Sequence, residues 1–212
     1  MTTIRTSHNI IRVIVKNPIS VLETMLSQNG GRITSKEADS AGIHRMYLKK
    51  LVDEGKIVQV SRGIYQDSAS FEDELFNLQA QYPSGIFSYE TSLFLQGLLE
   101  RVPFNWTMTF KGSYHSPSLE SKGICIKHSS EKLYPIDITE TFTKAGNKVR
   151  AYSAERTLCE IMTKKANTDI QVITYAIKAY ATKKEKNLPK LMELSKLFHV
   201  EARIRAYLEV LL

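Results

Sequence analysis

Thr34 to Tyr65 read TSKEADSAGIHRMYLKKLVDEGKIVQVSRGIY. Thr34 and Glu37 have the spacing of a capping box, which predicts that a short helix begins there. Gly42 closes this helix, and a second helix is expected from about His44 to Glu54. Two short helices joined by a glycine-containing turn form the helix-turn-helix pattern.

A β-hairpin is expected directly after these helices. Lys56–Val60 alternates in the manner of a strand, Ser61–Gly63 is a turn, and Ile64 begins a return strand. A helix-turn-helix followed by a hairpin is a winged helix. We therefore predict a winged helix-turn-helix DNA-binding domain over residues 1–68.

A further helix precedes this motif. Ser20 and Glu23 form a second Ser-x-x-Glu spacing, and apolar residues recur after it at helical intervals. Asn29-Gly30-Gly31 ends this helix, and Arg32-Ile33 fits a very short strand. Residues 1–17 carry little pattern, so the sequence is compatible with either a flexible arm or an extra helix in this segment.

The helix expected at residues 44–54 would enter the major groove of DNA with its first half on the base edges. Its apolar residues define a buried face, which leaves Arg45, Met46 and Lys49 facing outward. Arg45 is the predicted guanine reader, because a guanidinium can bond two acceptors at once. The predicted DNA-binding residues are Ser35, Lys36, His44, Arg45, Tyr47, Lys49, Lys50 and Arg62.

The other residues of this set have different predicted roles. Lys49 and Lys50 suit phosphate contacts, and Arg62 at the tip of the wing suits a phosphate or the minor groove. Ser35 and Lys36 begin a helix, where backbone N–H groups and charge favour phosphate. Tyr47 is compatible with a place in the core and with a DNA contact. For His44, too, the sequence does not decide whether it contacts DNA.

The charge of the chain agrees with a polyanionic partner. Its 29 Lys and Arg outnumber 22 Asp and Glu, which gives a net charge of +7. Residues 1–67 carry +4 (10 basic, 6 acidic), residues 68–143 carry −4 (5 and 9), and residues 144–212 carry +7 (14 and 7). Residues 18–67 alone carry only +1, and helix-turn-helix domains also bind proteins. The position of the cations on the outer face is what favours DNA.

The winged-helix sequence of residues 34–65 resembles the N-terminal domain of AbiEi-type antitoxins, the regulators of type IV toxin–antitoxin and abortive-infection modules. Two later motifs strengthen the resemblance, which extends over about residues 18–212. They are IFSYETSL at Ile86–Leu93, continued by Leu95, Gly97 and Leu98, and VRAYSAERTLCE at Val149–Glu160.

The resemblance implies two activities. The winged helix would bind inverted repeats in double-stranded promoter DNA and repress its own operon. The C-terminal domain would counteract a nucleotidyltransferase-like toxin in phage defence, with or without a stable complex. Two alternatives stay open, namely a winged-helix regulator with no toxin partner and a winged-helix module that binds protein. Both a monomer and a dimer on DNA are compatible with the sequence.

The rest of the chain predicts an α+β antitoxin domain over residues 69–212, so the fold class is α+β with a small sheet and C-terminal helices. Helices are expected from Ser70-x-x-Asp73 to Tyr82 and from Ser88 through Leu99. Strands are expected at 106–110, 123–126 and 149–152, with a polar loop at 113–118 and a turn at 145–147. Ser153 is expected to cap the next helix, and three more helices follow it to the C-terminus.

Basic residues in the last third of the chain lie mostly off the apolar helix faces. A solvated surface explains them, and so does a surface that extends the DNA footprint or meets the toxin or its nucleic-acid substrate. The possible basic surface comprises Lys164, Lys165, Lys183, Lys184, Lys186, Lys190, Arg203 and Arg205. Arg156 is expected instead to form a structural ion pair in the interior.

Enzyme chemistry is not indicated. The sequence holds no P-loop, GxGxxG, HExxH or GxSxG motif, so neither catalytic residues nor a cofactor are predicted. His115, His128 and Cys125 are the nearest approach to a metal-binding set, and surface histidines are the better interpretation. Cys125 and Cys159 are expected to be buried free thiols, which suits a cytoplasmic protein. The apolar run Ile10–Val15 is too short for a membrane span, and a secretory signal is not expected.

Overall fold

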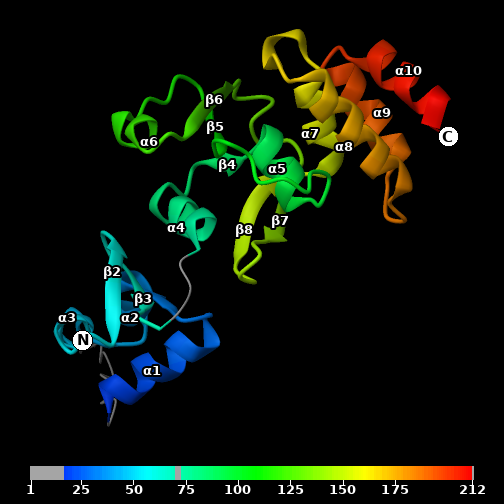
Figure 1. Ribbon diagram of the computed structural model, residues 1–212. Helices are drawn as coiled ribbons and strands as arrows, with labels where there is room; N and C mark the ends of the chain where they lie inside the picture. The colour runs from blue at the N-terminus through cyan, green and yellow to red at the C-terminus, as the bar shows by residue number, and fades with distance from the viewer. Residues whose placement is uncertain (1–16, 70–72, 212) are drawn as a thin grey trace, which may run out of the picture. The chain divides into compact units, whose positions relative to one another are not determined.

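The computed structural model describes residues 17–69 and 73–211 (Figure 1). The chain forms two compact units, Met1–Glu72 and Asp73–Leu212. The predicted fold class is confirmed, because an N-terminal winged helix precedes a larger α+β unit with a small sheet and C-terminal helices. The predictions for residues 1–16 and for Ser70 and Phe71 lie outside the described residues.

The first unit has the order of elements that the sequence predicts. Its sheet is antiparallel with the order β1-β3-β2, and a bulge lies between Gln59 and Ser61 of the hairpin. Ile33, Leu48 and Leu51 lie in its core. The elements described are α1 (Pro18–Gln28), β1 (Arg32–Thr34), α2 (Ser35–Ser40), α3 (Arg45–Asp53), β2 (Ile57–Ser61) and β3 (Ile64–Asp67).

The beginning of α1 differs from the prediction. Asn17, rather than Ser20, caps the helix, because its side-chain oxygen accepts a hydrogen bond from the Ser20 backbone N–H at 3.3 Å. Pro18 occupies the first helical position, where a residue without an N–H costs no hydrogen bond. The predicted Ser20–Glu23 capping box is therefore wrong, since a proline two residues earlier already starts the helix.

The second unit is built on a mixed sheet with the order β6-β5-β4-β8-β7. The short central strand β4 pairs antiparallel with β5 and parallel with β8. After the last strand, β8, the regular elements are all helical up to α10 (Figure 1). The elements are α4 (Glu74–Gln81), β4 (Ile86–Phe87), α5 (Tyr89–Leu95), β5 (Thr107–Lys111), α6 (Pro117–Ser121), β6 (Cys125–Ser129), β7 (Ile138–Phe142), β8 (Lys148–Tyr152), α7 (Ala154–Ile161), η1 (Lys164–Ala166), α8 (Ile170–Thr182), α9 (Leu188–Leu197) and α10 (Glu201–Leu211).

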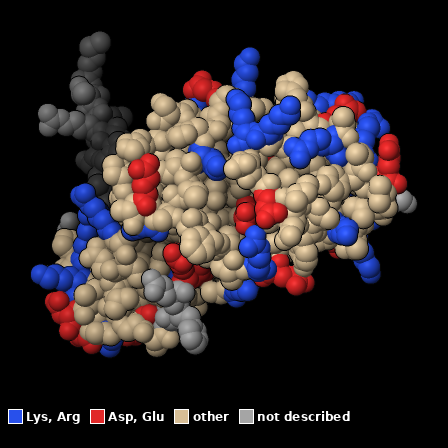
Figure 2. Space-filling view, turned by 45° about the horizontal axis from the view of Figure 1, so that its top comes forward, with Lys and Arg blue, Asp and Glu red and all other residues tan. Residues whose placement is uncertain are grey.

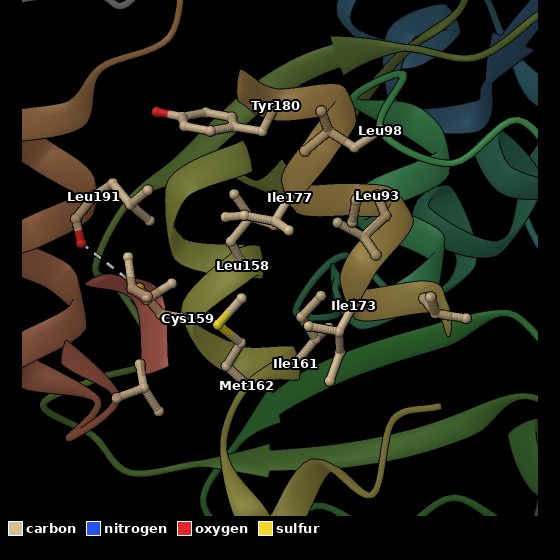
Figure 3. Close-up of a cluster of buried hydrophobic side chains, with 14 of the residues drawn as sticks. Leu93, Leu98, Leu158, Cys159, Ile161, Met162, Ile173, Ile177, Tyr180 and Leu191 are labelled. Carbon is tan, nitrogen blue, oxygen red and sulfur yellow. Dashed lines mark hydrogen bonds between the residues drawn. The ribbon is translucent and has the colours of Figure 1, made fainter. Parts of the chain in front are cut away.

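The largest core of this unit lies around α7. Leu158, Cys159 and Met162 pack against Ile173 and Ile177 of α8, as Figure 3 shows. Ser153 begins α7 as predicted, because its hydroxyl accepts a hydrogen bond from the Arg156 backbone N–H at 3.2 Å. All the residues from Glu155 to Ile161 are buried, so α7 is a central helix enclosed by its neighbours.

Several predicted boundaries in the second unit are wrong. Asp73 caps α4, and α5 ends at Leu95, because Gly97 turns the chain with a φ of +66°. Leu98 and Leu99 are buried beyond the end of that helix. Pro117 and Ser118, expected in the polar loop 113–118, instead begin α6, and the edge strand β7 was not predicted.

Both cysteines are free thiols, but only one is buried. Cys159 is fully buried, with its Sγ 3.8 Å from the Leu191 carbonyl (Figure 3), and burial raises the pKa of its thiol to about 12. Cys125 is half-buried on β6, so the prediction of a buried thiol is wrong there. Among the described residues, no helix has the length and hydrophobicity needed to cross a membrane.

Candidate nucleic-acid interface

The start of α2 is fixed by the predicted capping box. The Thr34 hydroxyl accepts a hydrogen bond from the Glu37 backbone N–H at 3.1 Å, and Glu37 Oε2 accepts one from the Thr34 N–H at 2.7 Å. Gly42 has a φ of +74°, a conformation that costs glycine little, and turns the chain toward α3. These local bonds set the geometry of the helix-turn-helix.

His44 ends the turn and caps α3. Its ring Nδ1 accepts a hydrogen bond from the Met46 backbone N–H at 3.2 Å, so the ring satisfies an N–H at the beginning of the helix. The side chain is exposed. The structure thus gives His44 a structural role at the position where a DNA contact was predicted.

The two faces of α3 are clearly separated. Leu48 and Leu51 are fully buried, whereas Arg45, Met46, Lys49 and Lys50 are exposed. Met46 is 62% exposed, which is unusual for so apolar a side chain. Tyr47 is half-buried and packs against the core of this unit.

Arg45 is held by a partner that sequence reasoning missed. Its Nη2 and Nε donate to Asp39 Oδ2 at 2.8 and 3.2 Å, and the hydrogen bond with Asp39 raises the pKa of the guanidinium. Asp39 lies near the end of α2, across the turn. The pair orients Arg45 along the outer face and leaves Nη1 without a bond to Asp39.

The wing is joined to the beginning of α2. The Ser35 backbone N–H donates to the Gly63 carbonyl at 2.8 Å, so this N–H is not free to bind phosphate as predicted. A Cβ added to Gly63 would lie 3.5 Å from Ser35 Oγ, which shows how closely the two segments approach. Arg62, beside Gly63, is exposed at the tip of the hairpin.

The cations of the first unit differ in whether a carboxylate already pairs with them. Lys56 Nζ lies 3.4 Å from a carboxylate oxygen of Glu23 and 3.3 Å from one of Glu54, and its hydrogen bond to Glu54 contributes most to the raised pKa of Lys56. Lys50 approaches Glu54 only to 3.9 Å. Within residues 17–69, the exposed cations with no carboxylate within 4 Å are Lys36, Lys49 and Arg62.

The eight cations of the possible basic surface are not equally available. Five make ion pairs or hydrogen bonds within their own unit: Lys183, Lys186, Lys190, Arg203 and Arg205. Within residues 73–211, Lys164, Lys165 and Lys184 are exposed and have no such partner. Figure 2 shows Lys and Arg side chains spread over the surface, with Asp and Glu side chains between them.

The histidines considered as part of a metal-binding set have other neighbours. His128 Nε2 lies 2.7 Å from the Tyr114 carbonyl, while His115 faces Glu120 at 3.3 Å. Asp137 pairs with Lys190 at 2.6 Å. No group of three or more His, Cys, Asp or Glu suited to a metal occurs in the described part of the chain.

Arg156 forms the buried ion pair expected for it. Its Nε and Nη2 both donate to Glu160 Oε1 at 3.1 Å, and Nη1 donates to the Leu133 carbonyl at 2.6 Å. The guanidinium carbon lies 3.3 Å from the centroid of the Tyr152 ring. Glu160 Oε2 is buried without a hydrogen-bond partner among the described residues. Burial raises the pKa of Glu160 to about 7, against the opposing effect of Arg156.

The Glu160→Gln variant should gain stability relative to the natural chain as pH rises from about 4.5 to 7. Folding raises the pKa of Glu160. The carboxyl therefore makes its full contribution to stability at pH values below its pKa in the unfolded chain, and this contribution is lost as pH rises through its pKa in the folded chain. The variant has no proton to lose, so its relative gain should reach about 3 kcal/mol. Urea unfolding at several pH values measures this difference, and a relative loss with rising pH would show that Arg156 outweighs burial.

Residues 21–66 match the family model described as transcriptional regulator, AbiEi antitoxin. The match runs from α1 to β3, so it confirms the predicted resemblance to AbiEi-type antitoxin regulators over the winged helix. No curated protein matches the sequence. Among solved structures, the crystal structure of RV2827C protein from Mycobacterium tuberculosis is similar with 12% identity and a TM-score of 0.48, over 91% of this chain and 80% of that one.

Proposed function

Because residues 21–66 match the model of AbiEi antitoxin regulators, we propose that the chain is a sequence-specific DNA-binding protein that represses its own toxin–antitoxin operon. The observation that carries this proposal is the outer face of α3 within the matched segment, where Arg45, Met46 and Lys49 are exposed. Its site of action is promoter DNA in the cytoplasm, and no catalytic activity is proposed for it.

On DNA, α3 lies in the major groove with its first turn against the base edges. Arg45 reads a guanine through the guanidinium protons that Asp39 leaves free. Lys36, Lys49 and Lys50 contact phosphates, and Arg62 brings the wing to a phosphate or the minor groove. These contacts combine one specific reader with several contacts that do not depend on sequence.

The second unit is proposed to supply the antitoxin activity against a nucleotidyltransferase-like toxin of a type IV module that acts in phage defence. Of the predicted basic surface, the cations available for such a contact are Lys164, Lys165 and Lys184. Co-expression of the chain with a neighbouring nucleotidyltransferase gene tests this activity. Growth arrest that the chain does not relieve would favour a regulator without a toxin partner.

Binding to the DNA upstream of the chain's own gene tests the repressor activity. We expect tighter binding to this DNA than to a scrambled duplex of the same length, with protection of inverted repeats in footprinting. Equal binding to both duplexes would remove the repressor proposal. Absence of binding to either would favour a winged helix that binds protein.

The Arg45→Ala and Lys49→Ala variants are expected to lose affinity in different ways. Arg45→Ala should weaken operator binding about 5- to 150-fold and relax the preference at one base pair. Lys49→Ala should weaken operator and scrambled duplexes about equally, because phosphates carry no sequence information. Fluorescence anisotropy on both duplexes measures the ratio of affinities.

Lys56→Ala is the matched control for these variants. It removes the same charge, but Lys56 is bonded to Glu23 and Glu54 and is not expected to touch DNA. It should leave both affinities close to those of the natural chain. Equal losses on the two duplexes for Arg45→Ala would reject the base-reading role of Arg45. Neither DNA-binding variant should lose the ability to relieve toxicity if that activity belongs to the second unit.

A further inference from the structure

A cavity of about 230 Å³ is lined by residues of the second unit alone. Its walls come from the first turn of α5, the loop before β5, strand β6 and the segment after η1. The residues that matter for its chemistry are Tyr89, Phe104, Cys125, Lys127 and Asn167. Segments far apart in the sequence thus contribute an aromatic, a cationic and an amide group to one hollow.

Phe104 is the most exposed large apolar residue of the described chain. Its side chain is 98% exposed, while its neighbour Pro103 is buried. The ring keeps its apolar surface in water and borders the cavity, so it is available to a ligand there. A flat aromatic ring at the mouth of a cavity is suited to stacking with a planar ligand group.

Lys127 supplies a cation to the same cavity. It is half-buried on β6, and its Nζ lies 5.1 Å from the centroid of the Tyr89 ring. Within the described ranges, no carboxylate lies within 4 Å of this Nζ. The cavity also contains Glu90, but that carboxylate pairs with Arg101 at 3.5 Å. The ammonium of Lys127 is therefore left without an anionic partner.

The lining segment Ala166–Thr168 has an unusual backbone. Lys164 and Lys165, which precede it in the sequence, are exposed but do not line the cavity. Tyr89 and Asn167 both have a φ of +50°, which non-glycine residues rarely adopt. Such conformations concentrate at binding sites, where the surrounding structure enforces them.

We propose that this cavity binds a nucleotide, with its phosphate at Lys127 and its base stacked on Phe104. An anion is favoured by Lys127, the cation that lines the cavity without a carboxylate partner among the described residues, and stacking requires a planar ring. The volume is below the roughly 300–1,000 Å³ of sites that enclose a drug-sized ligand. The cavity therefore holds the phosphate and sugar, while the base lies at the rim. A free nucleotide and a nucleotide of a single strand share this chemistry.

Calorimetric titration of the full chain tests the proposal. The probes are adenosine 5′-monophosphate, adenosine, inorganic phosphate and a short single-stranded oligoadenylate. The Phe104→Ala variant is expected to lose about 5- to 100-fold in affinity for the nucleotide, as base–aromatic stacking requires. The Lys127→Gln variant should bring the affinity for the monophosphate down to that for adenosine, and should leave adenosine binding unchanged.

Each variant has a control in the same unit. Phe142→Ala removes another exposed phenyl ring, which lies on β7 and does not line the cavity. Lys132→Gln removes an exposed cation that does not line it either. Cys125 gives an independent readout, since bound nucleotide should slow its alkylation while the buried Cys159 reacts slowly throughout.

The different probes distinguish a free nucleotide from a nucleotide within a single strand. Binding of the monophosphate indicates a free nucleotide, whereas binding of the oligoadenylate alone, weakened by both cavity variants, indicates a strand. The proposal is overturned if neither probe binds, or if the controls weaken binding as much as the cavity variants do. Operator binding through α3 should be unchanged by Phe104→Ala and Lys127→Gln, so failure here is distinct from failure of the repressor proposal.

Discussion

Replacing Arg156 by Met should lower the unfolding free energy of the second unit by about 3–5 kcal/mol. The guanidinium is completely buried and binds Glu160 and the Leu133 carbonyl. A methionine side chain fills much of the same volume but donates no hydrogen bond. It therefore leaves the Glu160 carboxyl and the carbonyl without partners in an environment that water cannot reach.

Urea unfolding followed by circular dichroism measures this loss. Arg205→Met is the matched control, because Arg205 also pairs with a glutamate four residues away, Glu201 at 2.9 Å, but on an exposed helix face. The control should cost only about 0.5 kcal/mol or less. The double variant Arg156→Met/Glu160→Met should recover part of the loss, since no charge is left buried. Similar small costs for Arg156→Met and Arg205→Met would show that the buried pair contributes little to stability.

The parts of the fold that the sequence predicted depend on neighbouring residues. Thr34 with Glu37, and Ser153 with Arg156, cap their helices through bonds that span three residues. The turn at 145–147 joins β7 to β8 in the same local way. Such signals are contained in short segments, so periodicity and spacing reveal them without any knowledge of the tertiary structure.

The parts that were missed depend on distant residues. Strand β4 has only two residues, and it exists because β5 and β8 pair with its two edges. β7 is an edge strand whose residues are mostly half-buried, so it lacks a strong apolar alternation. Its register against β8 fixes Ile138 opposite Tyr152, a pairing that no local pattern encodes.

The same distinction applies to the candidate interface. The outer face of α3 follows from the helical spacing of Leu48 and Leu51, which are both buried. The bond between Arg45 and Asp39 crosses the turn, and the bond between Ser35 and Gly63 joins a helix to the wing. Both bonds change what the predicted residues offer to DNA, and both arise only once the elements are packed together.

The affinity for a single operator repeat should fall about 100-fold between 50 and 200 mM salt. The winged helix offers four cations to phosphates, namely Lys36, Lys49, Lys50 and Arg62, because Lys56 is already paired. Each neutralised phosphate contributes about 0.9 to the slope of log affinity against log salt, so four give a slope near −3.6. Two repeats bound together double the slope, and the loss becomes about 10⁴-fold.

A salt series on duplexes with one and two repeats measures both slopes. Lys49→Ala should reduce the slope for one repeat by about 0.9, whereas Lys56→Ala should leave it unchanged. A slope for one repeat much steeper than −4 would mean that cations outside the winged helix reach the DNA. Lys164, Lys165 and Lys184 are the exposed candidates, because the other cations of the predicted basic surface are bonded within their own unit. A slope near zero would contradict phosphate binding by α3 and the wing, since counterion release cannot be avoided when cations meet DNA.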